Sequence, residues 1–164
     1  MQIRPVRPEE ADELGAITVT AYTELPGHVP EPDYEAELAD VATRAAHAEV
    51  LVAVEDDGTV LGGVTFVPDG DNPMAEHGVA GATSIRMLAV AAAAQGRGVG
   101  EALVRACLDR SRELGAERVV LHSTDWMQAA HRLYLRLGFV RRPDLDWQPV
   151  PDIPLLGFSL DLDR

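Results

Sequence analysis

Residues 95–100 read QGRGVG and stand directly before a run of helical character, EALVRACLDR. Amide N–H groups at the start of a helix lack intrahelical acceptors and carry partial positive charge, so they bind anions and especially phosphates. Three glycines would let a diphosphate approach those amides closely, and Arg97 would add a movable positive charge. A tight turn with positive φ angles is the simpler alternative, but it requires fewer glycines and no arginine. The hexapeptide therefore predicts an anion-binding loop.

The hexapeptide does not match the two most familiar nucleotide loops. A nucleoside-triphosphate loop ends in Gly-Lys-Ser/Thr, whereas Gly100 is followed by Glu101 and the sequence contains no lysine. A dinucleotide-binding loop needs a small residue at the place of Leu103, and it follows the first strand of its fold. Here the loop stands in mid-chain, after four expected strands. Both kinds of nucleotide site are disfavoured.

The chain before the loop predicts two helices and four strands. Pro8 opens the first helix, which has an acidic first turn and an apolar face of Leu14, Ile17 and Ala21. Two β-rich runs around Asp-Gly predict a hairpin. The expected elements are a strand at 1–7, the helix that Pro8 opens, a helix at 32–47, hairpin strands at 49–55 and 60–67, and a strand at 84–90.

From the loop onward, helices alternate with strands, which predicts a parallel pair of strands joined by a helix. The expected elements are a helix at 97–114, a strand at 117–123, a helix at 127–137 that ends at Gly138, and strands at 139–142 and 155–162 joined by the proline-rich connector 143–154. The sequence thus predicts one α+β domain over residues 1–164. Its sheet is mixed and mostly antiparallel, with about seven strands, four helices and a parallel pair in the middle.

Four segments together resemble the GNAT superfamily of N-acetyltransferases. QGRGVG is similar to the (Q/R)-x-x-G-x-(G/A) pyrophosphate loop of that superfamily, IRMLAV to its fourth strand and ERVVLHS to its fifth. AAHRLYLRLGF is similar to its A-x-x-L-Y-x-x-x-G-F segment. The order of elements also resembles the GNAT fold over nearly all 164 residues, although the N-terminal third matches in element order only.

This resemblance implies that acetyl-CoA is the co-substrate. The fourth and fifth strands would splay apart, and the pantetheine arm would lie between them against the backbone of Leu88, Ala89 and Val90. Arg86, Arg132 and Arg136 are available for the nucleotide phosphates. Met127 occupies a position where the superfamily often has an asparagine that contacts the arm, and a thioether cannot replace an amide. The resemblance implies that the diphosphate loop consists of Gln95, Gly96, Arg97, Gly98, Val99 and Gly100.

Acetyl transfer to an amine needs a proton donor for the departing CoA sulfur. Tyr134 stands where many GNAT enzymes have this general acid, and a phenol with a pKa near ~10 is protonated at neutral pH. The alternative for Tyr134 is a core side chain beside Leu133.

The sequence does not identify the general base that would deprotonate the amine. Side chains from three segments are candidates for base or acceptor contacts, and a water relay without a dedicated base is equally compatible. The candidates are Glu24 and His28 between the first two helices, Glu76 and His77 in the loop before the fourth strand, and His122 and Ser123 at the end of the fifth.

The charge of the chain limits the kinds of molecule that we expect it to bind. The sequence has 14 basic residues, all arginine, against 27 acidic ones, for a formal charge of −13. Such a field repels nucleic acid and is compatible with a small-molecule or peptide amine acceptor of cationic character. No apolar run reaches about 18 residues and the N-terminus lacks a signal-like core, so we expect a cytoplasmic protein without a membrane span.

For the cysteine, three of the histidines and one tryptophan the sequence predicts structural roles. Cys107 lies on the apolar helix face, so we expect a core residue, and His47, His77 and His131 lack metal-ligand spacing, so we expect no metal. Trp147 is expected to pack the connector against the sheet, or else to line the acceptor pocket. The resemblance also allows a homodimer. Alternative functions are a non-catalytic acyl-CoA sensor and transfer to oxygen or of a longer acyl chain.

Overall fold

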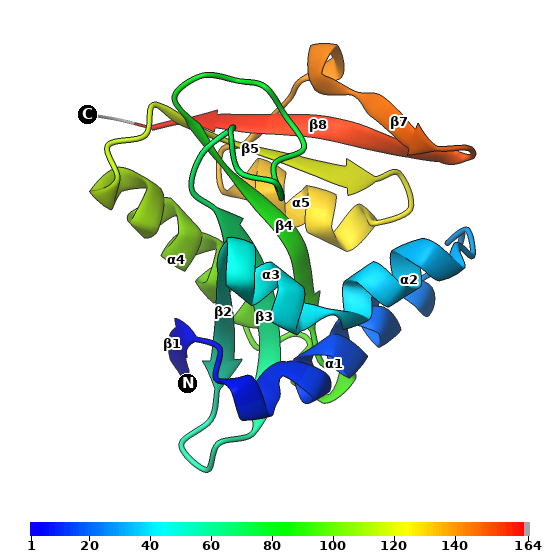
Figure 1. Ribbon diagram of the computed structural model, residues 1–164, viewed down its shortest axis with the longest axis vertical. Coiled ribbons are helices and arrows are strands. Elements are labelled where there is room, and N and C mark those ends of the chain that lie inside the picture. The colour runs from blue at the N-terminus through cyan, green and yellow to red at the C-terminus, as the bar shows by residue number, and fades with distance from the viewer. Residues whose placement is uncertain (163–164) are drawn as a thin grey trace.

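The computed structural model describes residues 1–162 as one mixed sheet with helices on both faces (Figure 1). In spatial order the strands are β1 (Gln2–Pro5), β2 (Glu49–Val54), β3 (Val60–Val67), β4 (Ala82–Val90), β5 (Arg118–Thr124), β8 (Ile153–Asp161) and β6 (Val140–Arg141), and β7 (Trp147–Val150) also pairs with β8. Only β4 and β5 are parallel neighbours. The helices are α1 (Ala11–Thr23), α2 (Pro32–Ala39), α3 (Val41–His47), α4 (Val99–Glu113) and α5 (Gln128–Arg136).

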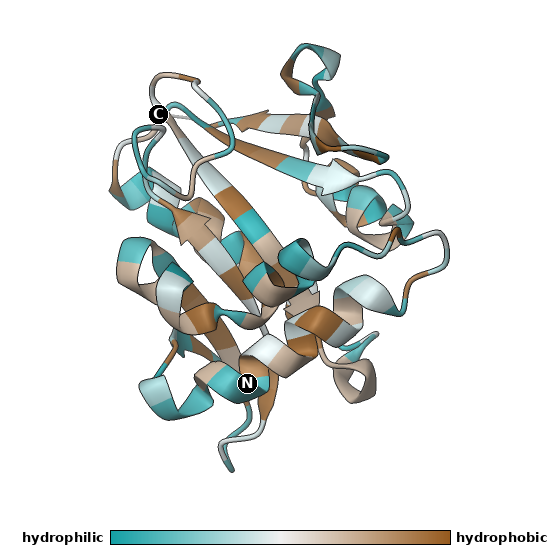
Figure 2. Cartoon of the chain, turned by 45° about the vertical axis from the view of Figure 1, so that its right-hand side comes forward, coloured by the Kyte–Doolittle hydropathy of each residue, from teal (hydrophilic) through white to brown (hydrophobic). Residues whose placement is uncertain are grey.

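Two apolar cores cover the two faces of this sheet. The larger core packs α4 and α5 against the strands and includes Cys107 and Tyr134, while the smaller packs α1 and α3 against β2 and β3. Helices α1–α3 lie in front of the sheet in Figure 1, and α4 and α5 lie behind it. Figure 2 shows hydrophobic residues concentrated along the strands. Burial also raises the pKa of Cys107, as expected of a core thiol.

The expected mixed sheet with a central parallel pair is confirmed, but two details were wrong. The helix expected at 32–47 is broken into α2 and α3 at Asp40, whose carboxylate accepts hydrogen bonds from the amide and hydroxyl of Thr43 at 3.1 and 2.6 Å. The connector contains a strand, β7, that the sequence did not predict. The described chain therefore has eight strands and five α-helices where about seven and four were expected.

Trp147 lies in the connector and is not among the residues that line the pocket described below. It lies on β7, pairs with Leu155 of β8 and leaves 43% of its surface exposed. The connector is held to β8 by the pairing of β7, by the Arg141–Asp146 ion pair and by close packing of Leu145 on Gly157.

A buried arginine fixes the C-terminal end of α2. Arg44 of α3 is 2% exposed and donates to the carbonyl oxygens of Glu37 and Leu38 and to the Thr65 hydroxyl of β3. Burial lowers the pKa of its guanidinium. These carbonyls are among the four that every helix leaves without intrahelical donors. Arg44 thus anchors α2, and with it Tyr34, to the sheet.

Glu10 joins β1 to the start of α1. Its carboxylate accepts two hydrogen bonds from Arg4, at 2.7 and 2.8 Å, and one from the Arg7 amide at 2.8 Å. The Arg4 guanidinium is the main cause that lowers the pKa of Glu10 from 4.5 to about 2. Because the folded pKa is the lower one, the stabilisation is complete above pH 4.5 and is lost as the pH falls toward 2.

We therefore expect Glu10→Gln to lower the free energy of unfolding by about 1–3 kcal/mol at pH 7, the usual range for hydrogen bonds to charged groups. The difference from the unmodified chain should shrink between pH 4.5 and pH 2.5 in urea unfolding. Glu9→Gln, which removes the neighbouring exposed carboxylate, is the matched control. Equal effects of the two substitutions at pH 7 would contradict the assigned role of Glu10.

Candidate active site

The parallel strands β4 and β5 separate along their length. Their backbone pairing covers only Ala82–Ile85 of β4 and Arg118–Leu121 of β5. Beyond that point β4 runs on to Val90, paired with β3, and β5 runs on to Thr124, paired with β8. Figure 1 shows the gap between the two strands widening. The inner edges of both strands thus offer backbone donors and acceptors without a strand partner.

A β-bulge in β4 lies where the separation begins. Opposite Val64 of β3 stand two residues of β4, Met87 and Leu88, because the register shifts between Gly63 and Thr65. Met87 has a φ of +54°, a conformation that costs a non-glycine residue about 1–3 kcal/mol. A bulge bends its strand and increases the local twist. This bend directs the second half of β4 away from β5.

The glycine loop joins β4 to α4, with a short 3-10 turn, Ala92–Ala94, between them. Gly96 and Gly98 have φ angles of +78° and +79°, so the turn does require two of the glycines. The first intrahelical donor of α4 is the amide of Ala102, which bonds to Gly98 O at 3.0 Å. The amides at 98–101 therefore lack intrahelical acceptors. A Cβ at Gly96 or Gly98 would meet nothing within 4 Å, so the space in front of them is open.

Carboxylates surround this loop. Arg97 forms an ion pair with Glu55 at the end of β2, and Arg136 of α5 pairs with Glu101 of α4 at 3.0 Å. Side-chain hydrogen bonds from Arg136 and Arg105 lower the pKa of Glu101. Arg132 lies exposed on α5. An anion at the loop would compete with Glu55 for Arg97.

A pocket lies where β4 and β5 have separated. Its walls come from α1, α2, the loop before β4, the bulge, and the end of β5 with the turn after it. The lining residues are Tyr22, Tyr34, Glu76, Arg86, Met87, His122, Ser123, Thr124, Met127 and Leu155. A larger hollow at the other end of β4, between residues 68–82 and 114–117, has mostly glycine, alanine and acidic walls. The pocket between β4 and β5 is thus the one of the two that is lined by tyrosine, histidine, arginine and hydroxyl side chains.

Two tyrosines and an ion pair form one side of this pocket. Tyr22 and Tyr34 meet edge to face with ring centroids 6.3 Å apart. Arg86, whose side chain is 9% exposed, pairs with Glu76 at 2.9 Å and with Glu37 at 3.4 Å. Arg86 is thus bound at the pocket, whereas Arg132 and Arg136 lie on α5.

Tyr134 lies in the larger core, on α5. It is 5% exposed, and its ring contacts Phe139 and Phe158 at centroid distances of 5.7 and 6.0 Å. Burial is the main cause that raises its pKa, so its hydroxyl stays protonated at neutral pH. Tyr134 is also among the groups that raise the pKa of Tyr22 in the pocket.

The candidate bases fall into two groups. His122, Ser123 and Glu76 line the pocket, as does Met127, which caps α5. Glu24 caps the C-terminal end of α1 and His28 follows in the loop, and neither lines the pocket. His77 accepts a hydrogen bond from the Val79 amide at 3.0 Å, and burial lowers its pKa.

Sequence reasoning did not select Tyr22, Tyr34 or His131. His131 bonds through Nε2 to Thr124 O at 2.9 Å and to Ser123 Oγ at 3.1 Å. Its place three residues before Tyr134 put it on the same helix face, a signal that could have identified it. The two tyrosines carried no such signal, because their proximity depends on how α1 and α2 pack.

Family comparison agrees with this geometry. Residues 13–139 match the model of the Acetyltransferase (GNAT) family. The chain belongs to this family. It is 31% identical over 144 residues to the mycothiol acetyltransferase of Sanguibacter keddieii, covering 86% of this chain and 44% of that protein. The chain spans about half the length of the curated relatives it matches, from 44% to 65%.

Solved structures show the same fold. A GNAT-family acetyltransferase from Staphylococcus aureus superposes with a TM-score of 0.78 at 12% identity and covers 99% of both chains. The YncA structure from Salmonella typhimurium, determined with its cofactor acetyl-CoA, has a TM-score of 0.67 at 23% identity and covers 100% of this chain and 95% of its own.

Two features, a metal-binding cluster and a membrane-spanning helix, are absent from residues 1–162. No group of three or more His, Cys, Asp or Glu side chains is placed to hold a metal ion within that range. No helix in the same range combines the length and apolar character needed to cross a bilayer.

Proposed function

We propose that this GNAT-family chain transfers the acetyl group of acetyl-CoA to a primary amine by direct attack in a ternary complex. The observation that carries the proposal is the succession of three features along β4: a pocket with titratable walls at Arg86 and Met87, an unpaired strand edge facing β5, and amides without intrahelical acceptors at 98–101. In this proposal a reacting group, an extended amide-bearing arm and a diphosphate would lie at these features in that order.

In this proposal the residues from Gln95 to Gly100 bind the pyrophosphate through their amides, and Arg97 leaves Glu55 to contact it. The backbone of Leu88, Ala89 and Val90 pairs with the pantetheine arm like an added strand. The thioester then lies near Tyr134 and Met127. Met127 offers no amide to the arm, so backbone contacts carry more of the binding.

The acceptor is proposed to be a cationic amine. Residues 24–40, which form α2 and the loop before it, contain six acidic residues and no arginine. Tyr34 from this segment lines the pocket, and Glu37 forms an ion pair with Arg86 of the pocket wall. An acidic segment beside the pocket attracts ammonium groups and raises the local concentration of a cationic acceptor.

Tyr134 is proposed as the general acid. When the amine attacks, the C–S bond breaks and the thiolate needs a proton. A buried phenol with a raised pKa carries that proton at neutral pH and delivers it into a site with little water.

Release of free CoA thiol from acetyl-CoA across a panel of primary amines tests the activity. Amine-dependent release supports acetyl transfer to nitrogen. Tight binding of acetyl-CoA without release by any amine or alcohol would show an acyl-CoA sensor, and release with alcohols or longer acyl-CoAs alone would reassign the acceptor or the acyl group.

Tyr134→Phe is expected to lower kcat by about 10²–10³-fold, because it removes the proton donor and keeps the ring packing. Affinity for CoA should stay within about twofold, as measured by calorimetry. Unchanged turnover would contradict the acid role.

Gly98→Glu is expected to weaken CoA binding by more than about tenfold, because it places bulk and negative charge before the helix amides. Gly115→Glu at the opposite end of α4 is the matched control, since Gly115 also has a positive φ, +73°, and open space around its Cα. If the two variants bind CoA equally, the diphosphate does not lie at this loop.

Glu55→Gln is expected to tighten CoA binding about two- to fivefold, because it frees Arg97 and removes a carboxylate from the anion site. Asp56→Asn, which removes the adjacent exposed charge, should change the affinity less. Weaker CoA binding by the Glu55→Gln variant would show that Glu55 orders Arg97 for the ligand.

A further inference from the structure

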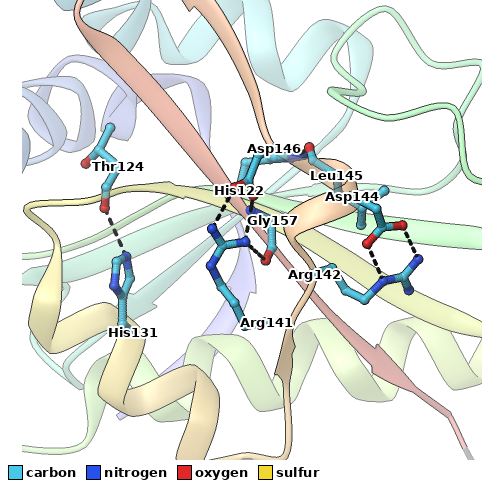
Figure 3. A network of polar contacts seen from close by, with 9 residues as sticks. All are labelled: His122, Thr124, His131, Arg141, Arg142, Asp144, Leu145, Asp146 and Gly157. Carbon is cyan, nitrogen blue, oxygen red and sulfur yellow. Dashed lines mark hydrogen bonds and ion pairs between the residues drawn. The ribbon is translucent and has the colours of Figure 1, made fainter.

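The connector after β6 is fixed to β8 by a carboxylate. Arg141 donates two hydrogen bonds to Asp146, both at 2.6 Å, and the Gly157 amide donates a third at 2.7 Å (Figure 3). Arg141 also donates to Gly157 O at 3.1 Å. A Cβ at Gly157 would lie 2.6 Å from the Leu145 Cβ, so only glycine permits this approach. We call Arg141, Asp146 and Gly157 the connector clamp.

The clamp fixes the carbonyl oxygen of Leu145, the residue directly before Asp146. This oxygen lies 2.8 Å from Nε2 of His122 (Figure 3). A carbonyl oxygen can only accept, so Nε2 carries the hydrogen and donates it. The neutral ring then has its lone pair on Nδ1. The connector therefore selects the tautomer of His122.

His122 also lines the pocket between β4 and β5. Charged and titratable groups face it from each neighbouring element: Asp146 from the connector, His77 and Glu76 from the loop before β4, Arg86 from β4, and Tyr22 and Tyr34 from α1 and α2. His131 donates to Thr124 O from α5 and is not among the pocket residues. His122 is thus the histidine that both lines the pocket and has its tautomer fixed by a carbonyl oxygen.

We propose that Nδ1 of His122 is the general base for the acceptor amine, and that Asp146 is a positioning residue that acts through Leu145 O. The proposal rests on the proposed acetyl transfer. The ammonium gives one proton to Nδ1, which passes it to solvent. The nitrogen lone pair then forms the C–N bond and the C–S bond breaks. The sulfur takes the proton of Tyr134, and the second proton of the nitrogen returns to the phenolate through water.

His122→Gln tests the base. The glutamine amide can still donate to Leu145 O, but it cannot accept a proton at neutral pH. We expect kcat/KM for the amine to fall about 10²-fold at pH 7, with the affinity for CoA unchanged. Because the variant can act only on amine that solution has already deprotonated, its kcat/KM should rise with pH more steeply than that of the unmodified protein.

Asp146→Asn tests the positioning. It removes the charged pair with Arg141, and we expect kcat to fall about tenfold with little change in KM for acetyl-CoA. Asp144→Asn is the matched control, because Asp144 forms an equivalent two-bond pair with Arg142, at 2.7 and 2.8 Å, in the same connector (Figure 3). Its kcat should stay within about twofold.

The outcomes separate the two proposals. If the unmodified protein releases no thiol with any amine, the proposed function is wrong. If the unmodified protein releases thiol and His122→Gln keeps both the rate and the pH dependence of the unmodified protein, the function stands and the base assignment is overturned. Equal losses from Asp146→Asn and Asp144→Asn would overturn the positioning role. Thermal unfolding of each variant verifies that the compared proteins are folded.

Discussion

The separation of β4 from β5 is the constraint on which the rest of the site depends. Four residue pairs hold the strands together, and the bulge at Met87 then bends β4 away from its neighbour. A sheet without this bend would satisfy its own backbone and leave no edge for a ligand. Because the bend also sets the direction in which the chain enters the glycine loop, the position of the α4 amides follows from the same irregularity. The unfavourable φ of Met87 is retained at the place where it opens the sheet.

Carboxylates beside the glycine loop add to the overall negative charge of the protein. The formal charge of −13 repels anions at long range, and Glu55 and Glu101 stand beside the loop itself. If a diphosphate binds at this loop, as we propose, the helix amides and the paired arginines must bind it against this negative field. Because Arg97 and Arg136 are held in place by these carboxylates, the proposed diphosphate would replace one anion by another and would order few new side chains.

Most of the fold was predictable because its signals are local. Proline and acidic residues marked the start of the first helix, Asp-Gly marked the hairpin, and Gly138 marked the end of α5. The break at Asp40 was missed because neither glycine nor proline marks it, although an aspartate three residues before a threonine is a capping signal. β7 was missed because it is an exposed strand with a proline at position 149, which local propensity assigns to a loop.

The site was predictable only where it is contiguous in sequence. The glycine loop and the Tyr134 segment could be read directly, but the bulge has no glycine to announce it. The pocket walls contributed by Tyr22 and Tyr34 depend on how α1 and α2 pack on the sheet, which no local pattern encodes. Glu24 and His28 lie in the expected break between helices, yet that break does not reach the pocket wall. The roles of the acid and base stay predictions.

Strand β8 supports both of the side chains to which we assign the proton transfers, Tyr134 and His122. Phe158 contacts the ring of Tyr134 on one face of the sheet, and the adjoining Gly157 holds the connector that carries the partner of His122. Neighbouring residues of a strand project to opposite sides. Two consecutive residues of β8 thus support both side chains, so a shift of this strand would move the surroundings of Tyr134 and of Leu145 O together.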